Sequence, residues 1–302
     1  MSLVERALKK IQESRAGVSP KLDADIAFAS RPAAPVGSAA MPESVEAAPA
    51  APTTPARVVH IDREALRAAR VLPPPQEERA LAHEYRHIKR PLIARALGRM
   101  GGTPIPNGHL IMVASALPGD GKTFTCINLA FSMALEKDLS VLLIDGDVAK
   151  PQISELLDLR SEPGLLDVLR DDSLDVESVI LSTDVPRLSV LPAGQQTDVA
   201  TELLASARME AVLRQITARD PNRIVLLDSP PLLATSESRV LASIAGQIVL
   251  VVRANQTPQQ AVVDALDLIE EGKSIGLVLN QATENVRKGY YDYYGQSASN
   301  QD

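Results

Sequence analysis

Six short apolar runs limit the folds open to this chain more than any other feature of its sequence. Each is rich in Val, Ile and Leu, and together they span 110–114, 141–144, 188–191, 224–227, 248–252 and 275–279. A short run of almost entirely apolar residues is typical of a strand buried on both faces, as in a parallel sheet. Helical periodicity lies between some of the runs, at 123–136, 201–218 and 258–271. The alternation predicts an α/β fold with a doubly wound, mostly parallel sheet flanked by helices and joined by right-handed crossovers.

A glycine-rich turn follows the first run and reads Ala-Leu-Pro-Gly-Asp-Gly-Lys-Thr over residues 116–123. It resembles the phosphate-binding pattern G-x-x-x-x-G-K-[ST], with Ala116 in place of the first glycine. The glycines allow backbone N–H groups to face a phosphate, and the next helix adds its positive N-terminal end. A strand before the turn and a helix after it favour this interpretation over a turn with an exposed lysine. We predict a P-loop NTPase fold that binds ATP through Pro118, Gly119, Asp120, Gly121, Lys122, Thr123 and Phe124.

Carboxylates follow two of the later runs. Residues 141–144 lead into Asp145-Gly146-Asp147, and residues 224–227 lead into Asp228-Ser229-Pro230-Pro231. In an open parallel sheet, these strand ends share the edge where the P-loop lies. An isolated aspartate of this kind is more simply a helix cap, but three of them beside a P-loop indicate a Mg²⁺ site, usually formed through the waters of the ion. We predict that Thr123, Asp145, Asp147 and Asp228 hold the metal, and that catalysis uses Lys122 with the three aspartates, Asp147 or Asp145 serving as the base.

Composition limits the kinds of partner and the cellular location that we expect for this protein. The net charge of -7 argues against nucleic acid as a partner, and a single cysteine, Cys126, allows no internal disulfide. No apolar stretch of about 18 residues is present, and the first residues are too polar for a signal peptide. We expect a cytoplasmic protein, a location that leaves room for docking at a membrane through a partner.

The two ends of the chain differ from its centre. Residues 2–14 have the spacing of a short amphipathic helix, and residues 32–56 contain 6 Pro and 9 Ala in 25 positions, which predicts a disordered linker. Residues 76–100 look helical, and Pro91 is expected to end or kink that helix. We predict an N-terminal extension over 1–75, a P-loop domain over 76–288 and a flexible tail over 289–302.

Four of the five tyrosines lie together in the tail, at Tyr290, Tyr291, Tyr293 and Tyr294. Aromatic residues usually lie in cores, because each buries a large apolar area. Four of them in a polar tail are better explained as phosphoacceptors, because a flexible tail can enter the active site of a neighbouring chain. Each phosphate then adds about -1.5 to -2 charges near neutral pH. A tail that is only an interaction segment is the alternative.

The P-loop, the run ending in Asp-x-Asp and the run ending in Asp-Ser-Pro-Pro resemble, in this order, the Walker A, A′ and B motifs of bacterial tyrosine kinases. Two further stretches, 164–169 and 191–194 followed by 202–204, also resemble this family, and the likeness covers about residues 80–295. The resemblance implies phosphoryl transfer from ATP to tyrosine, self-assembly into rings, and control of exopolysaccharide polymerisation. It also implies activation by a membrane protein of the chain-length-determinant type.

The N-terminal part and residues 84–91 are similar to one subgroup, the autokinases of exosortase-associated exopolysaccharide systems. The chain departs from the family in carrying Ala149 where an Arg is frequent, two positions after Asp147, and Lys150 follows it. Its counterparts to the family's self-association motif E-x-x-R-x-x-R are His83, Arg86 and Lys89.

Two other functions use the same fold. A Min- or Par-type ATPase would carry an extra lysine at the position of Ala116, so its absence and the tyrosine tail favour the kinase. A scaffold that binds nucleotide without chemistry is the third hypothesis.

Overall fold

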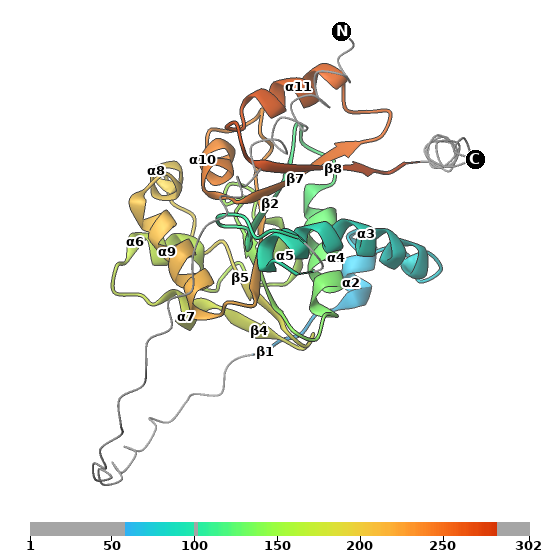
Figure 1. Cartoon of the computed structure of the whole chain (residues 1–302). Coiled ribbons are helices and arrows are strands. Elements are labelled where there is room, and N and C mark those ends of the chain that lie inside the picture. The colour runs from blue at the N-terminus through green and yellow to red at the C-terminus, as the bar shows by residue number, and fades with distance from the viewer. Residues whose placement is uncertain (1–57, 100–101, 283–302) are drawn as a thin grey trace, which may run out of the picture.

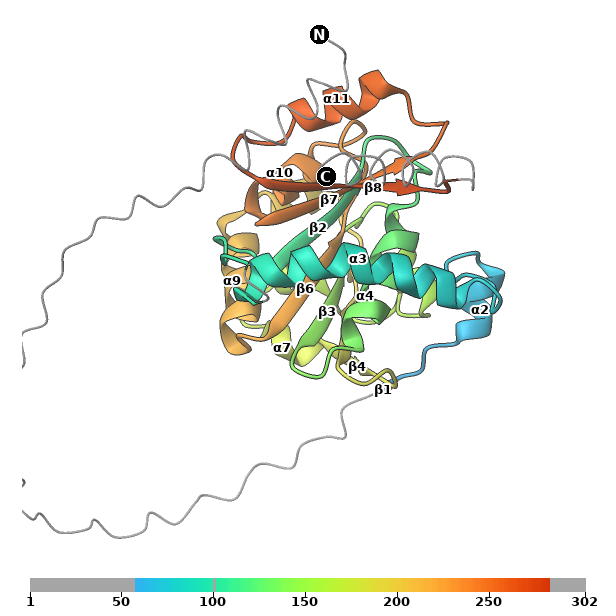
Figure 2. The same cartoon turned by 45° about the vertical axis from the view of Figure 1, so that its right-hand side comes forward.

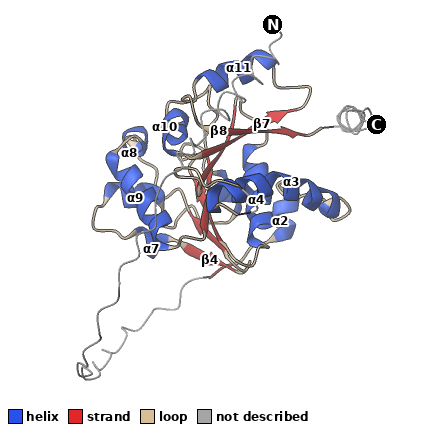
Figure 3. Ribbon diagram, in the orientation of Figure 1, coloured by secondary structure: helices blue, strands red, loops and turns tan. Residues whose placement is uncertain are grey.

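One eight-stranded sheet forms the centre of the molecule (Figures 1 and 3). The computed structural model describes residues 58–99 and 102–282, so the predicted N-terminal helix, the Ala/Pro linker and the tyrosine tail lie outside the described residues. The strands are β1 (Val58–Val59), β2 (Leu110–Ser115), β3 (Ser140–Asp145), β4 (Leu181–Thr183), β5 (Leu188–Leu191), β6 (Arg223–Asp228), β7 (Gln247–Arg253) and β8 (Ser274–Asn280).

The strand order is β1-β4-β5-β3-β6-β2-β7-β8, and every neighbouring pair is parallel except β4 with β5. All six predicted strands are present, which confirms the mostly parallel α/β sheet. The sequence did not reveal β1 and β4, because strands of two and three residues are too short to show a periodic pattern. The order places β3, β6 and β2 side by side in the centre, so their carboxyl ends meet at one place.

Helices cover both faces of this sheet (Figure 2). One face packs against α2 (Arg63–Ala68), α3 (Glu78–Leu97), α4 (Lys122–Ala134) and α5 (Gln152–Leu156). The other packs against α6 (Leu165–Arg170), α7 (Val176–Val179), α8 (Ala200–Leu204), α9 (Ala207–Arg219), α10 (Glu237–Ile244) and α11 (Gln259–Asp267).

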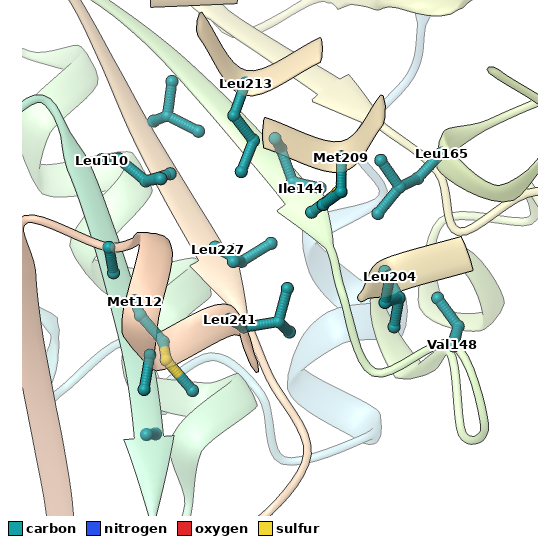
Figure 4. Packing of buried hydrophobic residues seen from close by; sticks show 14 of the residues in the cluster. Leu110, Met112, Ile144, Val148, Leu165, Leu204, Met209, Leu213, Leu227 and Leu241 are labelled. Carbon is teal, nitrogen blue, oxygen red and sulfur yellow. The ribbon is translucent and has the colours of Figure 1, made fainter. Parts of the chain in front are cut away.

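The core is aliphatic, because only 3% of the residues of the chain are Phe, Trp or Tyr. On the α6–α11 face, Met112 of β2, Ile144 of β3 and Leu227 of β6 lie beneath Met209 of α9 and Leu241 of α10 (Figure 4). All five are fully buried. Burying a side chain of this size stabilises the fold by about 1.5–3 kcal/mol, so the two packed faces hold the central strands, and with them the strand ends, in place.

The last strand corrects one expectation. β8 was predicted to be buried on both faces, but Leu277 and Leu279 are 45% and 51% exposed. β8 pairs only with β7 among the described strands and lies at the border of the sheet, where the helices leave part of one face uncovered.

Two predicted helices differ in detail. The stretch 201–218 is divided into α8 and α9, because the side chain of Ser206 accepts a hydrogen bond from Met209 N and caps a new helix. Pro91 does not end α3, which continues to Leu97 with Leu92, Ile93 and Ala96 buried. The packing of this face on the sheet holds the helix together past the proline.

The folded region begins before residue 76. Val59, Ile61, Leu66 and Leu72 are buried in the same core as α3 and α4, and β1 pairs with β4. Residues 58–75 are thus part of the P-loop domain and not of the N-terminal extension that we predicted over 1–75.

Candidate active site

The phosphate-binding loop connects β2 to α4 at the carboxyl edge of the sheet. Gly119 and Gly121 have φ angles of 85° and 96°, a left-handed conformation that side chains rarely adopt. A Cβ at Gly121 would lie 2.0 Å from Asn280 Nδ2, whereas one at Gly119 would meet no atom within 4 Å. The loop is therefore packed tightly against β8 on one side and open at Gly119, and the first amides of α4 lie at its end.

A carboxylate inside the loop holds it to two neighbouring elements. Asp120 is 4% exposed; its Oδ2 accepts a hydrogen bond from Leu117 N at 3.1 Å, and its Oδ1 accepts one from Thr257 Oγ1 at 2.7 Å. Its main-chain carbonyl accepts a hydrogen bond from Asn280 Nδ2 at 2.9 Å. Asp120, predicted only as a nucleotide-binding position, thus fixes the loop against the start of α11 and the end of β8.

Lys122 and Thr123 open α4 and point toward the aspartates. Lys122 Nζ lies 3.0 Å from Asp147 Oδ2, and both side chains are nearly buried. Thr123 Oγ1 lies 2.7 Å from Asp228 Oδ2 and 2.9 Å from Gln152 Oε1. The predicted phosphate-binding and acidic residues are therefore in direct contact.

Strand register brings the two inner aspartates together. Asp145 and Asp228 are paired residues at the ends of β3 and β6, and neither is exposed to solvent. Asp145 Oδ2 accepts hydrogen bonds from Ser154 N at 2.7 Å and Ser154 Oγ at 2.8 Å. Asp145 therefore also satisfies an amide in the first turn of α5, the capping role that was the alternative interpretation of this residue.

The enclosure of these charges changes their protonation. Burial and the charge of Asp228 raise the pKa of Asp145 to about 7. Burial raises the pKa of Asp228 to about 6, although the charge of Lys122 opposes this. Burial alone would lower the pKa of Lys122, but the carboxylates of Asp228 and Asp147 outweigh it and raise the value. The site has more negative charge than one lysine balances, so a further cation is favoured there.

The fit to Mg²⁺ can be judged from the oxygen atoms. Asp145 Oδ1 and Asp228 Oδ1 are buried and have no hydrogen-bond partner among the described residues, and an unpaired buried carboxylate oxygen is costly. Within residues 58–99 and 102–282, no three His, Cys, Asp or Glu side chains are grouped so as to hold a metal by themselves. The residues thus fit an ion that keeps its waters and takes phosphate oxygens, as Mg²⁺ does.

The sequence analysis did not identify several residues that form hydrogen bonds with the predicted site residues. Ser154 and Gln152 contact Asp145 and Thr123 from α5, while Thr257 and Asn280 hold the P-loop. Only Asn280 had a signal, since it ends a predicted strand at the shared edge. Among the other predicted nucleotide-binding residues, Pro118 is exposed and Phe124 is half-buried in the first turn of α4.

Comparison with known proteins agrees with this geometry. The family model described as an AAA domain matches residues 108–284. The tyrosine-protein kinase YwqD of Bacillus subtilis is 31% identical over 187 residues, covering 61% of this chain and 77% of the relative. The chain therefore carries an AAA domain and belongs to the bacterial tyrosine kinase family. The solved kinase domain of VpsO has a TM-score of 0.56 and 28% identity, and the match covers 70% of this chain and 100% of that domain.

Members of the bacterial tyrosine kinase family differ in length. The tyrosine-protein kinase ptk of Acinetobacter johnsonii is 30% identical over 174 residues, but these cover 57% of this chain and 23% of the relative. In the described part of this chain, no helix is both long and apolar enough to cross a membrane.

Lys89, the counterpart of the last arginine in the self-association motif of bacterial tyrosine kinases, points inward. It is 4% exposed, donates a hydrogen bond to Ser132 O at 2.5 Å and forms an ion pair with Glu136 at 2.8 Å. In this chain the residue joins α3 to the end of α4 and does not lie on the surface, in contrast to Arg86, which is exposed.

Proposed function

We propose that this chain is an ATP-dependent protein-tyrosine autokinase that phosphorylates Tyr290, Tyr291, Tyr293 and Tyr294. The observation that supports this most is the contact between Lys122 of the P-loop and Asp147 at the end of β3, with two further aspartates buried behind it. The family and the names of its members support the choice of tyrosine as acceptor.

The lysine contact suggests how the site changes when substrate arrives. Lys122 balances Asp147 at 3.0 Å, and the β- and γ-phosphates of ATP would compete for the same ammonium group. As Lys122 turns to the phosphates, Asp147 loses its ion-pair partner, and its Oδ2 becomes free to accept a proton. Substrate binding and activation of the base are in this way coupled through one side chain.

The aspartates divide into two roles. Asp145 is fixed by Ser154, and Asp228 contacts Thr123, so these two, with Thr123, would hold hydrated Mg²⁺. Bound Mg²⁺ would neutralise charge on the transferring phosphoryl group. Asp147, two residues past the inner Asp145, would accept the proton of the attacking tyrosine hydroxyl.

The fifth tyrosine is a poor acceptor. Tyr85 is 5% exposed, and burial raises its pKa although a hydrogen bond with Thr125 opposes the shift. A hydroxyl enclosed in this way cannot reach the active site of any chain without unfolding of α3. Autophosphorylation is therefore expected on the four tyrosines outside the described residues.

The wider role follows the resemblance of the sequence. We propose that the kinase regulates exopolysaccharide synthesis and export, belongs to the exosortase-associated subgroup, self-associates, and acts at the inner membrane through a chain-length-determinant-type activator. A Min- or Par-type ATPase is less well supported, because curated relatives such as YwqD and ptk are named tyrosine-protein kinases.

The test is to incubate the purified chain with Mg²⁺-ATP and map phosphotyrosine by mass spectrometry. Lys122→Met and Asp147→Asn should each lower the rate by about 10²–10³-fold, since each removes a group that acts on the transferring phosphoryl or the proton. The exposed Lys137→Met and Asp198→Asn serve as matched controls and should leave the rate unchanged. ATP hydrolysis without phosphotyrosine, also in the presence of a cytoplasmic fragment of the activator, would contradict the kinase assignment.

A further inference from the structure

The exposed side of α3 carries two histidines whose ring nitrogens converge. His83 and His87 are four residues apart, so they lie one above the other on the same face of the helix. Their Nε2 atoms are 3.2 Å apart, while the ring centroids are 4.8 Å apart with planes at 75°. The rings therefore approach each other at their Nε2 ends, and both residues are exposed.

This separation matches that of two imidazoles on one metal ion. Zn–N bonds are about 2.0–2.1 Å long, so two ligands at a tetrahedral angle have nitrogens about 3.3–3.4 Å apart. At a right angle, the same bonds place the nitrogens about 2.9 Å apart. The observed distance lies between these values, so an ion can bind with little movement of either ring.

The local sequence and the helix both suit this use. Residues 83–87 read His-Glu-Tyr-Arg-His, which is the spacing that places two histidine ligands on one helix face in zinc proteins. The opposite face of α3 is anchored by Tyr85, Leu92 and Ile93, all buried, and a rigid helix presents ligands more accurately than a loop.

We propose that His83 and His87 form a binding site for a divalent transition-metal ion such as Zn²⁺, separate from the nucleotide site. No third His, Cys, Asp or Glu of residues 58–99 and 102–282 joins the pair, so water completes the coordination. With only two protein ligands the site binds metal but lacks the arrangement of a zinc hydrolase.

The arginines near the pair provide a distinguishing property. Arg79 and Arg90 are exposed one turn before and one turn after it, and their charges repel a cation. Added salt screens this repulsion, so it should not weaken binding at this site. Zn²⁺ held by acidic surface groups of a chain with net charge -7 would bind more weakly in salt.

The experiment is a calorimetric titration of the full chain with Zn²⁺ in the absence of nucleotide, at low and at high salt. His83→Asn and His87→Asn should each weaken this binding about a hundredfold, because each removes one arm of a two-point attachment. His60→Asn and His109→Asn replace the only other histidines and should have no effect. Circular dichroism of each variant checks that the fold is retained.

A second readout identifies the atoms. Nuclear magnetic resonance of the imidazole nitrogens should show Zn²⁺ on Nε2 of both residues, with the proton on Nδ1. Zn²⁺ binding by His83→Asn and His87→Asn that is as strong as binding by the wild type would overturn the proposal. So would the absence of any change in the imidazole nitrogens, which would leave a simple N–H···N hydrogen bond between the two rings.

Discussion

Asparagine in place of Asp145 should stabilise the nucleotide-free protein at high pH, while it removes a carboxylate that we propose holds Mg²⁺. The carboxylate is completely buried, Oδ2 accepts from Ser154, and Oδ1 has no partner among the described residues. An asparagine can keep its oxygen toward Ser154 and place an NH₂ group where the unpaired oxygen lies. The substitution thus retains the hydrogen bonds and removes only the buried charge.

The size of the effect follows from the pKa of Asp145. Folding raises this pKa from 3.8 to about 7, so the folded state holds the proton more tightly than the unfolded chain. The corresponding stability is fully present below pH 3.8 and is lost as the pH rises toward 7. At 1.36 kcal/mol per pKa unit, the wild type loses about 3 kcal/mol between about pH 5 and pH 8.5 that Asp145→Asn does not lose.

Urea unfolding of both proteins at these two pH values, without Mg²⁺ and nucleotide, measures this difference. The advantage of the asparagine variant in free energy of unfolding should grow by about 3 kcal/mol from the lower to the higher pH. Asp198→Asn, at an exposed position, should show no such trend. A difference between Asp145→Asn and wild type that is the same at both pH values would refute the buried-charge argument.

Two other substitutions examine contacts that do not involve Asp145, Asp147 or Asp228. Thr257→Val removes the hydroxyl that donates a hydrogen bond to Asp120 and should raise the KM for ATP about tenfold with little change in kcat. Thr257→Ser keeps a hydroxyl and should have the wild-type KM. If Thr257→Ser has the same raised KM as Thr257→Val, the hydroxyl has no role. Lys89→Met leaves Ser132 O without its lysine donor and should lower the free energy of unfolding by about 1–3 kcal/mol in urea, whereas a loss no larger than that of the exposed Lys137→Met would contradict the importance of this contact.

The part of the site that the sequence predicted is the part set by strand order. Asp145, Asp228 and the P-loop each follow an apolar run, and parallel strands necessarily end at one edge. The contact of Thr123 with Asp228 and the pairing of Asp145 with Asp228 needed only that β3, β6 and β2 be neighbours, as they are. The four tail tyrosines lie outside the described residues, so their role stays a prediction.

The supporting residues could not be predicted because nothing in local sequence joins them to the site. Ser154 lies in a short helix of five residues, and Thr257 belongs to a loop distant in sequence from Asp120. For Lys89, local sequence gives the wrong location, because the side chain is buried. Its place in the counterpart of the self-association motif suggests an intermolecular charge, but a carbonyl of α4 and Glu136, just past the end of α4, receive it inside the domain.

The contact of Asn280 with the P-loop limits how far the tail tyrosines can lie from the P-loop of their own chain. Tyr290 lies ten residues after Asn280, and ten residues span at most about 33–36 Å. This distance is measured from the loop that is predicted to bind the phosphates, so Tyr290 lies within about 33–36 Å of the proposed active site of its own chain. For one chain to present Tyr290 to another, the phosphate loops of the two copies must come within a similar distance of each other. Any arrangement of copies that transfers phosphate to this tyrosine between chains must bring their catalytic edges that close.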